Sequence, residues 1–196
     1  HGQRTQFHQR VGERHQRATG QDLRLSWKGA VHQVRLTLIG GFQAENVLMA
    51  AGLVIAAGAA PGDVLSVLPG LTGVRGRMQL AATRKNGATV FVDYAHTPDA
   101  LKNVLNTIRD IRSGNERIIT VVGCGGDRDR AKRPVMAALA AQLSDKAILT
   151  SDNPRSENPE AILDEMMAGL TLEHKLHTIR ISDRAEAIQA ACMLAQ

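Results

Sequence analysis

From residue 89 onward, short apolar segments alternate with longer segments of helical periodicity, and this alternation constrains the fold more than any other feature. Residues 89–92, 118–122 and 147–150 are rich in β-branched side chains, which is typical of buried strands. Strands separated by helices of this length require right-handed crossovers, and the sheet that results is parallel with helices on both faces. We therefore predict an α/β fold with a mostly parallel sheet in the second half of the chain.

The segments between these strands predict amphipathic helices. The first begins at Pro98, and its apolar residues from Leu101 to Ile111 recur at the i, i+3, i+4 and i+7 spacing. The second carries Met136 and its apolar neighbours on one face, and the third begins at Pro159. A weak strand is predicted near residues 176–181, and a last helix over residues 183–195.

The first part of the chain predicts a different arrangement. Residues 1–20 are polar without any period, and we expect them to be irregular. Alternating apolar residues on both sides of a Lys28-Gly29 turn predict a hairpin. A helix is predicted over residues 40–58, with Asn46 in its first turn, and a shorter helix follows from Pro61.

A glycine-arginine segment at residues 73–78 marks a predicted domain boundary. It divides the chain into residues 1–76 and residues 77–196. Since the chain does not begin with Met, we expect it to be a fragment of a longer protein.

The segment from Arg117 to Pro134 combines a strand, a glycine turn and a run of charges. Gly123, Gly125 and Gly126 follow the strand directly, where glycine permits close approach of another backbone. The pattern is not G-x-G-x-x-G, because Arg128 stands where the third glycine would be, and no Walker A sequence occurs. A loop of this composition, beyond the carboxyl end of a strand, suits an anionic or zwitterionic ligand.

The predicted strands end at Asp93, Gly123 and Asp152, and we expect these three ends to share one edge of the sheet. Each motif also has a simpler interpretation taken singly. A strand-end Asp often caps a helix, and charges in a tight turn are often only solvated. The position of all three at one edge favours a binding site.

The side chains after the second and third strands suit an amino acid with more than one carboxylate. Arg155 offers a planar fork for one carboxylate, and Arg128 supplies a second cation. Asp152 and Asn153 are suited to the ammonium group.

Three further residues suit a nucleotide: Asp93 could accept from ribose hydroxyls, while Arg77 and His96 could approach phosphates. No residue is predicted to be a nucleophile, and no cysteine, histidine or carboxylate spacing indicates a metal site.

Composition argues against nucleic-acid binding and membrane insertion. The net charge of +5 arises within residues 1–36, which hold seven Lys and Arg against two Asp and Glu, and the remainder is neutral. Aromatic residues are only 3%, too few to stack bases. The longest apolar run is too short and too rich in glycine to cross a bilayer. Two cysteines without paired spacing indicate a reducing compartment, so we expect a cytoplasmic protein.

Five motifs, taken in order, resemble those of the Mur ligase family over about residues 21–196. They are G-x-F-x-x-x-N (40–46), G-R-M (76–78), D-Y-A-H-T-P (93–98), G-C-G-G-D-R-D-x-x-K-R-P (123–134) and D-N-P-R (152–155). D-N-P-R resembles the family's motif for recognising diaminopimelate, which lysine-adding relatives replace. Gln43 stands where the family usually has Asn.

The resemblance implies a Rossmann-like C-terminal domain (residues 77–196), preceded by the end of a central ATPase domain (residues 1–76). It implies an ATP-dependent, ADP-forming ligase of peptidoglycan precursor synthesis. Such an enzyme adds meso-diaminopimelate to UDP-N-acetylmuramoyl-L-alanyl-D-glutamate through an acyl phosphate, with Mg²⁺ neutralising the transferred group.

The resemblance also implies roles for residues of this chain. The residues expected to bind ATP are Asn46, which would contact adenine, and Arg77, Asp93 and His96. Those expected to bind diaminopimelate are Arg128, Asp152, Asn153, Pro154 and Arg155.

The expected P-loop, carboxylated lysine, Mg²⁺ ligands and UDP-substrate domain would precede residue 1, and a G-K-G-H-E segment would follow residue 196. We therefore assign no catalytic residue or metal ligand within this chain, and we expect no ligase activity from it alone. The expected partners are the UDP-linked dipeptide, meso-diaminopimelate and ATP. Alternatives are a lysine-adding or cyanophycin-type ligase, or a stand-alone flavodoxin-like binding module.

Overall fold

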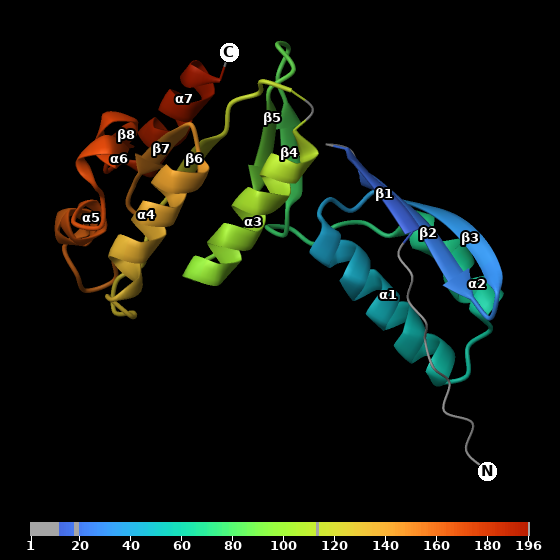
Figure 1. The fold of residues 1–196 in the computed structure, drawn as a ribbon. Coiled ribbons are helices and arrows are strands. Elements are labelled where there is room, and N and C mark those ends of the chain that lie inside the picture. Colours follow the sequence, from blue (N-terminus) through green and yellow to red (C-terminus); the bar gives the residue numbers. More distant parts are fainter. Residues whose placement is uncertain (1–11, 18–19, 113, 196) are drawn as a thin grey trace. The chain divides into compact units, whose positions relative to one another are not determined.

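The computed structural model of the chain describes residues 12–17, 20–112 and 114–195 (Figure 1). Of residues 1–20, which were expected to be irregular, residues 1–11, 18 and 19 lie outside the described residues. Backbone contacts divide the chain into two compact units. Unit 1 comprises residues 1–82 and 89–93, and unit 2 comprises residues 83–88 and 94–196.

Unit 1 contains a three-stranded antiparallel sheet formed by β1 (Gly12–Arg17), β2 (Gly20–Trp27) and β3 (Ala30–Leu36). The predicted hairpin is confirmed as β2 and β3. Its turn places Lys28 at φ 46° and Gly29 at φ 84°. Positive φ at both central residues is what a two-residue turn of type I′ requires, and its twist matches that of the strands.

The expectation of irregular structure was wrong for residues 12–17, which form β1. This strand pairs with the edge of β2, with Gln16 opposite Gln21 and Arg17 opposite Gly20. Backbone hydrogen bonds hold a strand of this kind, so its polar sequence shows no alternation that would reveal it.

Two predicted helices of unit 1 are confirmed: α1 (Gly41–Ala56) and α2 (Pro61–Val67), the latter followed by a 3₁₀ turn, η1 (Leu68–Gly70). Asn46 lies in the second turn of α1, not the first as expected, and its side chain is exposed. One face of the hairpin packs against the helices to form the core of unit 1, which includes Leu23, Leu25, Val34, Leu36, Ala44, Val47, Leu48 and Leu68.

The predicted strand at residues 89–92 is confirmed as β5 (Thr89–Val92), but its expected place in the parallel sheet was wrong. Among the described residues it pairs with β4 (Gln79–Thr83) in a separate two-stranded sheet. A five-residue connection joins the two strands, and Arg84 N donates to Ala88 O at 2.8 Å across it. Such a connection favours a hairpin, because a parallel pair needs a much longer crossover. Strand pairing therefore does not bring Asp93 to the edge where Gly123 and Asp152 lie.

Unit 2 contains the predicted parallel sheet, with strand order β6 (Ile119–Val122), β7 (Lys146–Leu149) and β8 (Thr178–Arg180) (Figure 1). Its helices are α3 (Pro98–Ile111), α4 (Lys132–Leu143), α5 (Pro159–Met167), α6 (Leu172–Leu176) and α7 (Arg184–Leu194). Helix α6 was not predicted, because five residues are too few to show a helical period. It ends where the weak strand was expected to begin, and that strand, predicted near residues 176–181, is confirmed as β8.

Polar caps set the beginnings of four helices in unit 2. The side chains of Thr97, Asn158, Thr171 and Asp183 accept hydrogen bonds from backbone N–H groups in the first turns of α3, α5, α6 and α7. Pro98 and Pro159 follow their caps directly, at the position where a missing N–H costs nothing. None of the helices built from described residues combines the length and apolar character that crossing a bilayer requires.

Helices cover both faces of the parallel sheet. Ala147 and Leu149 of β7 belong to one core cluster with α3, α4 and α5. Ile148 points to the opposite face and is also fully buried, and α7 packs against β6 and β7. The strand ends of this sheet are therefore held on a rigid support.

We predict that Leu149→Ala lowers the free energy of unfolding of unit 2 by about 3 kcal/mol, because it leaves a cavity in the core between the sheet and helices α3, α4 and α5. Urea unfolding followed by circular dichroism measures this. The control is Leu172→Ala in α6, where the side chain is 85% exposed and a change within about 0.5 kcal/mol is expected. Equal losses for the two variants would contradict the assigned core.

Candidate ligand-binding site beyond two parallel strands

Two loops leave the parallel sheet of unit 2 at the same edge. We call residues 123–131, after β6, the glycine loop, and residues 151–158, after β7, the Asn-Pro loop. Val122 lies opposite Leu149 in the parallel register, so both strands end at the same level. Thr150 N donates to Val122 O at 3.0 Å and continues the pairing to the point where the loops begin.

Glycine allows the two loops to approach each other closely. A Cβ atom at Gly123 would lie 2.5 Å from Thr150 O, and one at Gly126 would overlap the carbonyl oxygen of Pro154. Gly126 N donates to Asn153 O at 2.9 Å. Backbone atoms cannot move away cheaply, so these two positions admit only glycine in this conformation.

Side chains join the loops beyond this backbone contact. The carboxylate of Asp127 accepts from Ser156 Oγ at 2.7 Å and Ser156 N at 3.2 Å, and Asp127 N donates to Glu157 Oε1 at 2.6 Å. In the other direction, Arg155 Nη1 donates to Gly126 O at 2.5 Å. Asp127 and Arg155 both have positive φ, at 51° and 49°. The hydroxyl of Ser156 holds the pKa of Asp127 below its ordinary value.

A buried arginine lies beneath the two loops. Arg133 of α4 is fully buried, and its guanidinium donates to Glu157 Oε1 at 2.7 Å and Oε2 at 2.9 Å. It also donates to Glu165 Oε2 of α5 at 2.8 Å and to Gly125 O at 3.3 Å. The hydrogen bonds from Arg133 lower the pKa of Glu157 to about 2, and the same bonds raise the pKa of Arg133.

The Asn-Pro loop holds four of the five residues predicted to bind the amino acid. Asp152 is exposed and accepts from Arg184 Nη1 at 3.2 Å. Asn153 Oδ1 accepts from Arg155 N at 3.2 Å, which fixes the turn around Pro154. Pro154 is half-buried, and Arg155 is exposed apart from its bond to the glycine loop.

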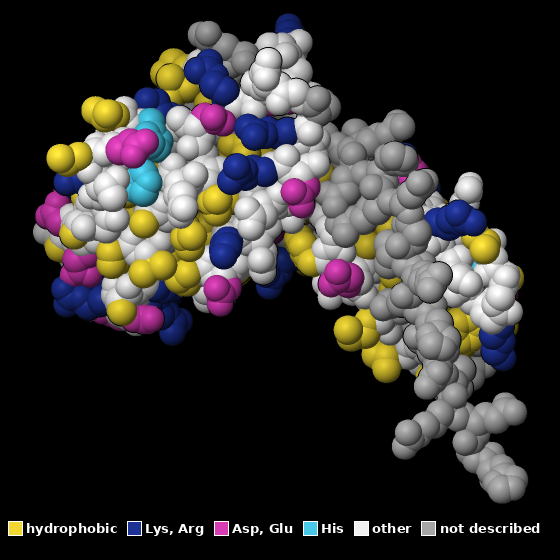
Figure 2. Space-filling view, in the orientation of Figure 1, with side chains coloured by type: hydrophobic (Ala, Val, Ile, Leu, Met, Phe, Trp, Pro, Cys, Tyr) yellow, Lys and Arg dark blue, Asp and Glu magenta, His cyan; other side chains and the backbone are white. Residues whose placement is uncertain are grey.

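Arg128, the fifth of these residues, is exposed and directly follows Asp127 in the glycine loop. Because Asp127 is bonded to Ser156, the structure brings together the two loops that carry Arg128 and Arg155. That both guanidinium groups bind one ligand stays a prediction. Figure 2 shows Lys and Arg side chains interspersed with Asp and Glu on the visible face of unit 2.

Of the residues predicted to bind a nucleotide, three lie in unit 1 and one lies in unit 2. Asp93 Oδ2 accepts from Met78 N at 2.8 Å, which ties the end of β5 to the residue after Arg77. Arg77 and Asn46 have exposed side chains. In unit 2, His96 is exposed, and its carbonyl oxygen accepts from Lys132 Nζ at 2.7 Å.

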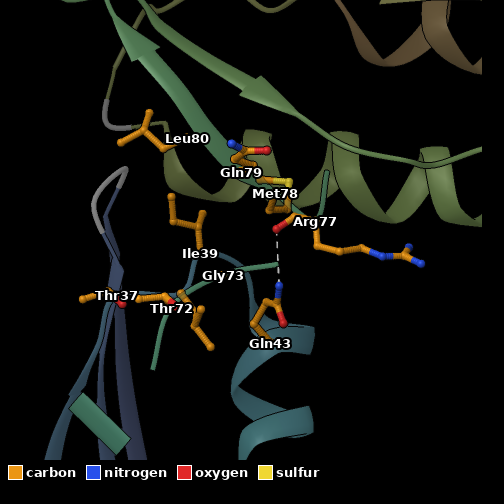
Figure 3. Close-up of a pocket in the computed structure, with 10 residues that line it drawn as sticks. Thr37, Ile39, Gln43, Thr72, Gly73, Arg77, Met78, Gln79 and Leu80 are labelled. Carbon is orange, nitrogen blue, oxygen red and sulfur yellow. Dashed lines mark hydrogen bonds between the residues drawn. The ribbon is translucent and has the colours of Figure 1, made fainter. Parts of the chain in front are cut away.

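Unit 1 has a pocket of about 390 Å³ beside Arg77 (Figure 3). Gln43 Nε2 donates to Arg77 O at 3.5 Å at its margin, while the guanidinium of Arg77 extends away from Ile39 and Leu80. The other residues that line it are Thr37, Leu38, Thr72, Gly73, Met78 and Gln79.

The sequence prediction missed the residues that hold the loops together, chiefly Arg133, Glu157 and Glu165. Arg133 belongs to a run of charges that suggested a solvated turn. One signal could have separated it from the others: Arg133 lies three residues before Met136 and four before Ala137, on the face of α4 that is buried.

Comparisons with known proteins agree with this fold. The family model described as "Mur ligase, glutamate ligase domain" matches residues 76–196. A curated UDP-N-acetylmuramoyl-L-alanyl-D-glutamate–2,6-diaminopimelate ligase from Bacteroides fragilis is 50% identical over 165 residues, which cover 84% of this chain and 34% of that protein. The ligase of the same name from Caulobacter vibrioides is 48% identical over 175 residues, which cover 89% and 35%. The chain thus spans about a third of the length of these relatives.

Two solved structures also match nearly all of this chain with part of their own length. A structure of a diaminopimelate ligase of that name matches 95% of this chain and 37% of its own, with TM-score 0.66 and 37% identity. The folylpolyglutamate synthase of Mycobacterium tuberculosis complexed with ADP matches 94% of this chain and 40% of its own, with TM-score 0.69 and 24% identity, and shows the fold alone.

We predict that Gly126→Ala destabilises unit 2 by about 1–3 kcal/mol, because the added methyl group forces the two loops apart. Thermal and urea unfolding measure the change. Gly114→Ala is the matched control, since a Cβ there would meet Glu116 at an ordinary contact distance of 3.6 Å. Unchanged stability of Gly126→Ala would contradict the close approach of the loops.

We also predict a pH dependence that arises from Glu157. Its pKa is lowered from 4.5 to about 2 in the folded chain, so its contribution to stability is complete above about pH 4.5 and is lost as the pH falls towards 2. Glu157→Gln should therefore be less stable than the parent at pH 7, and the difference should shrink in acid. Urea midpoints between pH 7 and about 2.5 measure it, with Glu173→Gln in exposed α6 as the control. A stability difference between Glu157→Gln and the parent that does not change with pH would contradict this prediction.

Proposed function

This chain belongs to the Mur ligase family, and we propose that it is part of an ATP-dependent, ADP-forming ligase that adds meso-diaminopimelate to UDP-N-acetylmuramoyl-L-alanyl-D-glutamate. The observation that carries the proposal is the D-N-P-R turn, bonded to the glycine loop in a chain about 50% identical to ligases of that name. The enzyme would act in the cytoplasm, in peptidoglycan precursor synthesis. The proposed domains are residues 1–76 and residues 77–196.

In this reaction ATP supplies the phosphoryl group that activates the glutamate carboxylate as an acyl phosphate, and the amine of diaminopimelate then displaces phosphate. We place the P-loop and the Mg²⁺ ligands outside this chain. Among the described residues, no three His, Cys, Asp or Glu side chains gather as a metal site would need, so no step through Mg²⁺ is assigned here. The part of this segment is to hold and orient its ligands.

For the incoming amino acid, Arg155 and Arg128 bind carboxylates, while Asp152 and Asn153 bind the ammonium group. Nη1 of Arg155 donates to Gly126 O, which aims the rest of the fork away from that contact. The ion pair of Asp152 with Arg184 is about half exposed on both sides, and exchanging one partner for a ligand costs little in such a setting. Pro154 keeps the turn between Asn153 and Arg155 rigid.

For ATP, Asn46 contacts adenine, and Arg77, Asp93 and His96 line the nucleotide. Their chemistry fits this ligand: an exposed amide for a base edge, an exposed guanidinium for phosphates and a carboxylate for ribose hydroxyls. The bond from Met78 N to Asp93 fixes the backbone that carries Arg77.

The test uses a complete ligase that carries this segment. We predict that Arg155→Ala raises the KM for meso-diaminopimelate about ten- to a hundredfold, since a hydrogen bond to a charged group contributes about 1.5–3 kcal/mol, and leaves the KM for ATP unchanged. Arg109→Ala, on an exposed position of α3, is the control. An unchanged KM would remove Arg155 from the site.

The same enzyme assayed with a panel of amino acids decides the acceptor. Faster turnover with L-lysine than with meso-diaminopimelate would refute the assigned acceptor and favour a lysine-adding ligase.

A further inference from the structure

The buried guanidinium of Arg133 contacts both loops of the proposed amino-acid site. It donates to both carboxylate oxygens of Glu157 in the Asn-Pro loop, and to the carbonyl oxygen of Gly125 in the glycine loop. Its third partner, Glu165 of α5, anchors it to the helix layer. Arg133 is thus a bridge between the loops and the rigid core, although it is too deeply buried to meet a ligand in solvent.

The ion pair of Arg133 with Glu157 fixes the orientation of the two side chains more than it stabilises the fold. A buried ion pair adds little net stability compared with well-packed apolar side chains of the same volume, because removing the charges from water offsets their attraction. A bidentate pair between guanidinium and carboxylate does, however, fix the relative orientation of the two groups. Arg133 therefore holds the carboxylate of Glu157 in one position.

Two short routes lead from Arg133 to Arg155. Through the Asn-Pro loop, Glu157 Oε1 also accepts from Asp127 N, and Asp127 in turn binds Ser156, the neighbour of Arg155. Through the glycine loop, Arg133 binds the carbonyl of Gly125, and the next carbonyl, that of Gly126, is the anchor of Arg155 Nη1. The contact of Arg155 with Gly126, and that of its neighbour Ser156 with Asp127, thus each lie one step from a group bonded to Arg133.

We propose that Arg133 is a positioning residue for amino-acid binding: its bonds to Glu157 and Gly125 hold the two loops at the separation at which Arg155 faces the ligand. The inference rests on the proposed function, and it extends the site inward to a residue that does not touch the substrate. It requires the planar fork of arginine, because a lysine ammonium cannot bond both oxygens of Glu157 and the carbonyl of Gly125 in the same geometry.

The chain provides a control for the loss of an arginine that bridges two carboxylates. Arg180 also joins two carboxylates, Glu160 and Asp164 of α5, at 2.5 Å each. It contacts neither the glycine loop nor the carboxylate of Glu157 among the described residues. Removing it therefore breaks an ion-pair network of the same composition without touching the proposed site.

The experiment measures steady-state kinetics of a complete ligase that carries this segment, with four variants: Arg133→Met, Arg133→Lys, Arg180→Met and Arg155→Ala. We expect Arg133→Met and Arg133→Lys each to raise the KM for meso-diaminopimelate about tenfold, with the KM for ATP unchanged. Arg180→Met should leave both KM values unchanged. Restoration of the parent KM by Arg133→Lys would show that charge, not the fork, is what matters, and would overturn the proposal.

A double variant separates positioning from independent binding. Because Arg133 acts through Arg155, Arg133→Met combined with Arg155→Ala should raise the KM no further than Arg155→Ala alone. Multiplicative effects of the two substitutions would overturn the proposal. If Arg133→Met does not fold, Glu157→Gln replaces it in the double variant. Combined with Arg155→Ala it should raise the KM no further than Arg155→Ala alone, and multiplicative effects would again overturn the proposal.

The same kinetics distinguish a purely structural role of Arg133 from a wrongly placed amino-acid site. If Arg155→Ala raises the KM for meso-diaminopimelate and Arg133→Met changes only the melting temperature, Arg133 is merely structural and the proposed function stands. If neither substitution changes that KM, the amino-acid site itself is wrongly placed and both proposals fall.

Discussion

The bidentate pairing of buried Arg133 with Glu157 is the interaction on which the arrangement of the two loops of unit 2 depends. It joins the first turn of α4 to the loop after β7, two segments that are separated in sequence by most of a β-α unit. The parallel register of β6 and β7 brings the loops to one edge, but register alone leaves their tips free to separate. Three sets of hydrogen bonds hold the tips together. They are the bonds of the Arg133 guanidinium, the bond from Gly126 N to Asn153 O, and the bonds from Ser156 to the Asp127 carboxylate.

Arginine has two different tasks within this small region. Arg133 is buried, and both of its Nη atoms donate to acceptors, so it acts on the shape of the loops. Arg128 and Arg155 are exposed, and among the described residues Arg155 is held by a single guanidinium bond to the backbone. A guanidinium that is oriented yet still open to solvent is suited to a carboxylate ligand, because little side-chain entropy remains to be lost on binding.

Most of the architecture could be predicted from the chain itself. The β-α alternation, the prolines at helix starts and the Lys28-Gly29 turn predicted the parallel sheet, α3, α5 and the hairpin, because each depends on local periodicity or turn chemistry. The failures share a cause. None of the missed features has a side-chain period to detect. Strand β1 and the pairing of β5 with β4 depend on backbone hydrogen bonds, and helix α6 is only five residues long.

The sequence by itself determined that this is an α/β chain of the Mur ligase family with glycine and arginine loops after successive strands, because those features are written in residue types and spacing. Only the tertiary structure decided which arginine of the charge run lies in the core and which face solvent, and that β5 stands outside the parallel sheet. The physical reason is that burial and strand pairing depend on partners brought from distant positions. From the sequence, the charges between Asp127 and Arg133 are all expected to be solvated. In the folded chain Arg133 is instead buried, because it pairs with Glu157 and Glu165.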